Sequence, residues 1–149
     1  MCFGIKLIDF SIATKLSSET QEIPNVNSLE GTLAYLSPEQ TGQMQRGIDY
    51  RSDFYSLGVT FYKLFTGELP FPSNDPIELI HSHLAKTPIS ADQINSNIPL
   101  TLSEIIGKLM AKNAENCYQT ALGIKHDLGL PTLALLYILI CGRFESKLL

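Results

Sequence analysis

Apolar side chains between residues 54 and 65 recur with the spacing of an α-helix. One side of this predicted helix carries Phe54, Leu57, Phe61, Leu64 and Phe65, and the other side carries Val59 and Tyr62. A helix that is apolar nearly all round belongs inside a domain. The helix should end at Thr66, because Gly67 suits the left-handed residue after a helix and Pro70 follows shortly.

Two further helices are predicted from their first residues. The run Asp75-Pro76-Ile77-Glu78 combines a capping side chain, a proline in the first turn and a carboxylate at the third helical position. The run Thr101-Leu102-Ser103-Glu104 repeats the capping-box pattern, and one apolar stripe follows it, made of Leu102, Ile105, Ile106, Leu109 and Met110. A last helical piece is expected over residues 118–124, without a clear cap.

The beginning of the chain has a different pattern. Phe3, Ile5 and Leu7 alternate with Gly4 and Lys6, which predicts a short β-hairpin at the N-terminus, one strand of which ends at Asp9. Residues 14–28 are polar and follow neither the helical nor the strand period, so they should form a surface loop. The fold class predicted from the whole pattern is mostly α with this short β element.

Composition and charge narrow the function classes. With 149 residues, 44% of them hydrophobic and 17% charged, the chain suits one globular domain and is too short for two catalytic domains. A net charge of -4 without a basic run argues against a nucleic-acid partner. Cys2, Cys117 and Cys141 lie far apart and form no C-x-x-C pair, which favours a reducing, cytoplasmic location.

The C-terminal segment is apolar. No charged side chain occurs between Leu128 and Gly142. This run is shorter than the about 20 residues of a membrane-spanning helix, and Gly129 and Pro131 interrupt its start. A buried or incomplete helix is therefore favoured, and membrane association through residues 129–142 is the less favoured alternative.

Three motifs stand above this background. They are Asp9-Phe10-Ser11, Ser37-Pro38-Glu39 at the end of the run from Gly31, and Asp53 at the start of the apolar helix. In order and spacing they resemble the D-F-G motif, the A-P-E motif and the central-helix aspartate of the C-terminal lobe of a serine/threonine protein kinase. Within the family, residues 30–42 are similar to bacterial multi-domain kinases that also contain an ATPase and a sensor histidine-kinase region.

The resemblance implies a truncated α+β kinase fold. Residues 1–128 would be a kinase-like C-lobe with an activation segment over 9–39, and residues 129–149 a tail unrelated to the family. Asp9 would bind the Mg²⁺ that bridges the phosphates of ATP, with Phe10 and Ser11 completing the cofactor-binding turn. The platform for a protein substrate would consist of Gly31, Thr32, Tyr35, Ser37, Pro38 and Glu39.

Four residues of the predicted activation segment could accept a regulatory phosphate, although polar loops contain such residues in any case. They are Ser17, Ser18, Thr20 and Ser28. His81 and His83 suggest a metal site only weakly, because residues two apart diverge on a helix.

The chain also departs from the family pattern. Ser11 replaces the glycine of D-F-G, and Cys117 stands where the family has an arginine that pairs with the carboxylate at Glu39. Loss of one partner from a buried ion pair typically costs about 3–5 kcal/mol. In the family, the aspartate at Asp53 accepts hydrogen bonds from the catalytic loop, which this sequence lacks. Both carboxylates are therefore expected to be without partners.

The sequence contains no glycine-rich loop, no phosphate-binding lysine with its helix glutamate and no catalytic base of the kinase pattern. The expected function is therefore that of a fragment of an ATP-dependent serine/threonine protein kinase that is inactive as an isolated chain. The alternative is a non-catalytic, pseudokinase-like module that binds a protein partner.

Overall fold

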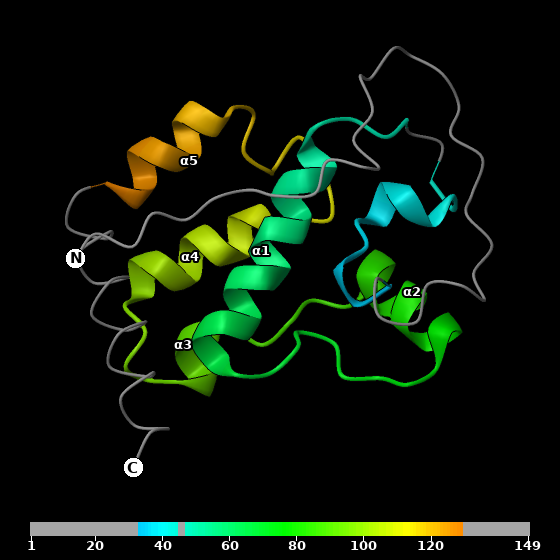
Figure 1. The fold of residues 1–149 in the computed structure, drawn as a ribbon, viewed down its shortest axis with the longest axis horizontal. Helices are drawn as coiled ribbons and strands as arrows, with labels where there is room; N and C mark the ends of the chain where they lie inside the picture. Colours follow the sequence, from blue (N-terminus) through cyan, green and yellow to red (C-terminus); the bar gives the residue numbers. More distant parts are fainter. Residues whose placement is uncertain (1–32, 45–46, 130–149) are drawn as a thin grey trace, which may run out of the picture.

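The computed structural model describes residues 33–44 and 47–129, and these residues are helical with connecting loops (Figure 1). Two short 3-10 helices, η2 (Leu33–Tyr35) and η3 (Pro38–Thr41), precede α1 (Arg51–Thr66). The remaining helices are α2 (Pro76–Ala85), α3 (Ala91–Ile94), α4 (Leu100–Leu109) and α5 (Ala121–Leu128). The predicted N-terminal β-hairpin, most of the activation segment and residues 130–149 lie outside the described residues.

Helix α1 is the central element, as predicted, and it crosses α4 in Figure 1. It ends at Thr66, where Gly67 adopts a φ of 88° and its N–H donates to the carbonyl of Lys63 at 2.8 Å. The apolar side chains of α1 are not all buried, however. Its buried aromatic side chains face the core, whereas Leu64 keeps 43% of its surface exposed and Thr60 is exposed.

The main core lies where α1 packs on α2, α3, α4 and η2. Its fully buried members include Val59 from α1 and Leu102 and Ile106 from α4. A second cluster joins α4 to α5 and is formed by Ile105, Leu109, Cys117, Tyr118 and Ile124. The apolar stripe predicted for residues 102–110 is thus confirmed, because all five of its members are buried.

The sequence predicts side-chain caps at the starts of α2 and α4, and the structure confirms the one at α2. Asp75 caps α2, since its carboxylate accepts from the N–H of Ile77 at 2.9 Å, as the sequence predicted. The capping box predicted at Thr101 is wrong, because α4 begins at Leu100 after Pro99 and Thr101 lies within the helix. Ser103, inside the helix, is buried, and its hydroxyl donates to the carboxylate of Asp92, which joins α3 to α4.

Helix α5 begins later than the sequence suggested. Its cap is Thr120, whose hydroxyl oxygen accepts from the N–H of Gly123 at 3.1 Å, so the helix runs over 121–128 and not over 118–124. Tyr118 is buried before the helix and donates to the carboxylate of Asp127 at 2.9 Å. None of the helices over residues 33–44 and 47–129 is long and apolar enough to cross a membrane.

Candidate functional site

The predicted substrate platform forms two tight turns next to α1. Leu33 is buried in η2, and the N–H of Leu36 donates to its carbonyl at 3.2 Å. Ser37 is fully buried, and both its N–H and its hydroxyl donate to Oε1 of Gln40 at 3.0 Å. Pro38 begins η3 because a proline already has the backbone angle of a first helical residue. Local hydrogen bonds therefore define the shape of residues 33–41.

Side chains of α1 hold these turns in place. The hydroxyl of Ser56 donates to the carbonyl of Tyr35 at 2.8 Å, and the Nζ of Lys63 donates to the Tyr35 hydroxyl at 3.3 Å. Sequence reasoning missed these contacts. The only signal is that polar residues interrupt the otherwise apolar helix at positions 52, 56, 60 and 63.

Glu39 has a partner, contrary to the expectation from the sequence. The hydroxyl of Ser52 donates to its Oε1 at 2.6 Å, and Ser52 is only 3% exposed. Cys117 is buried in the second core cluster, with its thiol 3.6 Å from the carbonyl of Leu109. Burial raises the pKa of this thiol. The cysteine thus acts as a small apolar side chain, and a serine of α1 supplies the hydrogen bond to Glu39.

Replacing Ser52 with alanine should lower the free energy of unfolding by about 1.5–3 kcal/mol, because a half-buried carboxylate loses a hydrogen bond. Urea unfolding followed by circular dichroism measures this change. Thr60→Ala is the matched control, since the Thr60 hydroxyl is exposed on the same helix and donates to the carbonyl of Ser56. Equal losses in both variants would contradict a specific role for the bond to Glu39.

Asp53 and the two histidines of α2 differ in their exposure. Asp53 lies exposed in the first turn of α1, and within residues 33–44 and 47–129 its carboxylate has no hydrogen-bond partner. His81 is exposed on α2, whereas His83 is fully buried. The two imidazoles therefore diverge, and the described residues contain no cluster that could hold a metal ion.

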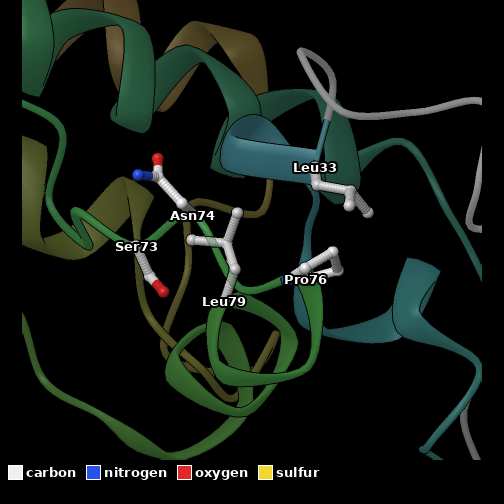
Figure 2. Close-up of a pocket in the computed structure, with 5 residues that line it drawn as sticks. All are labelled: Leu33, Ser73, Asn74, Pro76 and Leu79. Carbon is white, nitrogen blue, oxygen red and sulfur yellow. The ribbon is translucent and has the colours of Figure 1, made fainter.

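A pocket of about 320 Å³ opens beside the platform (Figure 2). Leu33 of η2 lines it together with Ser73, Asn74, Pro76 and Leu79 from the start of α2 and the loop before it. The lining therefore combines apolar side chains with a hydroxyl and an amide. A pocket of this kind can take an apolar side chain and hydrogen-bond to a neighbouring peptide group.

A polar cluster joins α1, α2 and the loop after α4, with Tyr55 and His83 buried and Lys112 half-buried. The Nζ of Lys112 donates to the Tyr55 hydroxyl at 3.0 Å and to the carbonyl of Ser82 at 3.3 Å, and it lies 4.4 Å from the centre of the Phe71 ring. No carboxylate in the described residues forms an ion pair with it. Burial lowers the pKa of Lys112 to about 8.

The lysine makes stability depend on pH. In the unfolded chain its pKa is about 10.4. Between pH 8 and 10.4 the unfolded state binds more protons at this site, so its contribution to stability rises with pH. Lys112→Met should remove this rise, which we expect to be about 1–2 kcal/mol because solvent reaches and screens part of the side chain. Urea unfolding at pH 7 and pH 9.5 measures it.

Lys86→Met serves as the control for Lys112→Met, because Lys86 is 48% exposed and pairs with an exposed Glu78. Above pH 10 the tyrosines have the opposite effect on stability to that of Lys112. Burial raises the pKa of Tyr55 and Tyr62, so their contribution to the free energy of unfolding falls as the pH rises. The measurements therefore stop below pH 10. A difference between wild type and Lys112→Met that is the same at both pH values would contradict the prediction.

The structure brings Tyr35, Ser37, Pro38 and Glu39 together beside α1, in and between η2 and η3. Apart from Asp53 and Cys117, the other predicted site residues lie outside the described residues, namely Asp9, Phe10, Ser11, Ser17, Ser18, Thr20, Ser28, Gly31 and Thr32. Their roles remain predictions from the sequence.

The sequence is similar to those of known protein kinases. The family model of the protein kinase domain matches residues 2–127. The chain is 39% identical over 127 residues to the serine/threonine-protein kinase PknB of Mycobacterium leprae, a match that covers 84% of this chain and 20% of that protein. It is 40% identical over 124 residues to a probable serine/threonine-protein kinase of Clostridium perfringens. This match covers 83% of the chain and 18% of that protein.

A third relative is the hybrid signal transduction histidine kinase G of Dictyostelium discoideum, which is 54% identical over 97 residues. This match covers 65% of the chain and 3% of the relative, and it agrees with the resemblance to multi-domain kinases that have a histidine-kinase region. The chain spans at most about a fifth of the length of these three relatives. From its domain match and its identity to the serine/threonine kinases, the chain belongs to the protein kinase family.

Proposed function

We propose that this chain is the substrate-binding half of an ATP-dependent serine/threonine protein kinase. The observation that carries the proposal is the turn of Ser37 to Glu39, which α1 holds through Ser52 and Ser56. Phosphoryl transfer depends mainly on positioning and on neutralisation of charge. A rigid turn beside a pocket supplies the positioning of a peptide hydroxyl.

The pocket supports a protein substrate. It lies between η2 and the start of α2, so a peptide lying along the platform would place one of its side chains against Leu33 and Leu79. Because Asp9 begins the motif that resembles D-F-G, it would hold the Mg²⁺ that neutralises the phosphates of ATP. Ser17, Ser18, Thr20 and Ser28 would be the candidate sites of regulatory phosphorylation in the activation segment.

We infer that the isolated chain does not transfer phosphate, because its sequence contains no catalytic base or phosphate-binding lysine of the kinase pattern. We place the protein in the cytoplasm because Cys117 is a free, buried thiol and the cysteine pattern suits a reducing compartment.

The test is a thermal melt of the purified chain with and without Mg-ATP, since a ligand that binds the folded state raises the melting temperature. The family resemblance implies ATP and Mg²⁺ as ligands, but we expect their binding to this chain to be weak or absent, because its sequence contains no glycine-rich loop or phosphate-binding lysine. Any rise with Mg-ATP should be small, and Asp9→Ala should abolish it. Glu104→Ala is the matched control, because Glu104 is an exposed carboxylate on α4, away from the platform. A cooperative melt that does not respond to Mg-ATP would contradict nucleotide binding and favour the non-catalytic interaction module.

A second assay tests the expected inactivity. The purified chain is incubated with Mg-ATP and a serine- and threonine-containing peptide, and phosphate incorporation is measured. We expect none above background. Incorporation that Asp9→Ala abolishes would contradict the inference that this chain alone is inactive.

A further inference from the structure

Helix α1 carries an apolar stripe along one of its sides. Phe54, Leu57 and Phe61 are half-buried there, and Leu64 keeps 43% of its surface exposed. These four residues follow the helical period, so they fall within an arc of about 80° around the helix axis. The stripe is about 15 Å long, because each residue adds about 1.5 Å along the axis. A stripe of this kind is a surface that another apolar segment can cover.

The stripe is separate from the side of α1 that holds the platform. The hydroxyls of Ser52 and Ser56 hydrogen-bond to Glu39 and to the carbonyl of Tyr35. At about 100° per residue, the two serines lie on the other side of the helix from the stripe. Figure 1 agrees, since it shows α2 on one side of α1 and α5 on the other. A segment that covers the stripe therefore lies away from the platform.

The described chain ends next to this stripe. Leu128, the last residue of α5, packs against both core clusters, and Phe61 of the stripe does the same. Both side chains therefore lie where the two clusters meet. Only residues 129–132 separate Leu128 from an apolar run at 133–141. Four residues span up to about 13 Å, which lets the apolar run reach the stripe.

The sequence of the apolar run suits the stripe. Every residue over 133–141 is apolar, and no charged side chain occurs from Leu128 to Gly142. As a helix, the run would be about 14 Å long, which is close to the length of the stripe. Residues 1–32 also lie outside the described residues, but they match the stripe less well. Lys6 interrupts their apolar start, and residues 14–28 are polar.

Covalent attachment favours the apolar run over other occupants of the stripe. Its short linker gives it a local concentration of about millimolar, which a second copy of the chain in dilute solution does not reach. A lipid bilayer competes poorly for the run, because a helix that spans the bilayer needs about 20 apolar residues. Burial on the stripe removes the apolar side chains of both partners from water.

We propose that residues 133–141 pack against the α1 stripe formed by Phe54, Leu57, Phe61 and Leu64. The C-terminal segment is then a structural part of this chain, and it covers an apolar surface that would otherwise be open to other proteins. The proposal does not rest on the proposed function, because the stripe and the platform occupy different sides of α1.

Paramagnetic relaxation enhancement in the full 149-residue chain tests the contact. The natural thiol of Cys141, the last residue of the apolar run, carries the spin label. Cys2→Ser removes a competing thiol, and Cys117 is buried. We expect the label to broaden the backbone amide signals of Leu57 and Leu64. Sharp signals from both residues would overturn the proposal.

Two controls make this measurement specific. Ile77 is 78% exposed on α2, which lies on the other side of α1 from α5 (Figure 1), so its amide signal should stay sharp. Equal broadening of Ile77 and Leu64 would overturn the proposal. The second control mixes spin-labelled chain without ¹⁵N and unlabelled ¹⁵N-enriched chain. Broadening of Leu64 in this mixture would identify a second copy as the occupant and would also overturn the proposal.

A pair of variants tests whether the stripe itself holds the apolar run. Leu64→Asp places a carboxylate in the stripe, and burial of an unpaired carboxylate is unfavourable. We expect this variant to lose the broadening of Leu57. Leu122→Asp is the matched control, because Leu122 is a leucine that is 75% exposed on α5, and it should keep the broadening. Equal broadening of Leu57 in the two variants would overturn the role of the stripe.

None of these measurements uses ATP or a peptide. A failed Mg-ATP melt would therefore count against the proposed function and leave the contact of the apolar run intact. Absence of broadening at the stripe would overturn that contact and leave the proposed function unchanged.

Discussion

Replacing Gly58 with valine should lower the free energy of unfolding by about 3 kcal/mol or prevent folding. Gly58 is buried on α1 where it meets the end of α4. A Cβ at this position would lie 2.8 Å from the Cβ of Leu109 and 2.8 Å from the Cγ of Met110. The Met110 side chain can move, but the Leu109 Cβ is attached directly to the α4 backbone. Relief of the overlap therefore requires the two helices to separate.

The measurement for Gly58→Val is urea unfolding of the purified variant. Gly107→Ala is the control, because no atom lies within 4 Å of the position of its Cβ. It lies in α4, where an alanine is favoured over glycine by about 0.5–1 kcal/mol, so this control should be slightly more stable than wild type. A Gly58→Val variant as stable as wild type would contradict the close approach of α1 and α4.

Leu102→Ala should lower the free energy of unfolding by about 2–5 kcal/mol. Leu102 is fully buried on α4 in the main core, and truncation removes its apolar contacts and leaves a cavity. Leu122→Ala is the matched control, since Leu122 is 75% exposed on α5 and its truncation should change stability by less than about 0.5 kcal/mol. Chemical denaturation compares the two, and similar losses in both would contradict the assignment of the core.

Much of the helical framework follows from the sequence. The end of α1 at Gly67, the capping of α2 by Asp75 and the buried stripe of α4 depend on residues within a turn or two of each other. Local spacing and local capping are the interactions that a sequence displays directly. The order and spacing of the motifs also indicated the kinase family before any fold was known, and the domain match over residues 2–127 agrees.

Other features of the framework required the packed structure. The start of α4 does not follow the capping box at Thr101, because the helix begins earlier, at Leu100 after Pro99, and Thr101 lies inside it. Leu64 is exposed, although the apolar pattern of α1 predicted a position inside the domain. The described neighbours of α1 cover the other faces of this helix and leave the face of Leu64 open. The pattern of α1 gives no information about which of its apolar faces a neighbour will cover.

The contacts of the candidate site also depend on the packed structure. From the resemblance to protein kinases, the sequence predicted that Ser37, Pro38 and Glu39 belong to one platform and that Cys117 is a poor partner for Glu39. Only the tertiary structure supplied Ser52 as the donor to Glu39 and joined Tyr55 to His83 and Lys112, residues that are 28 and 57 positions away from it. Hydrogen bonds between buried side chains depend on which helices meet, and helix packing brings together residues that no local pattern connects.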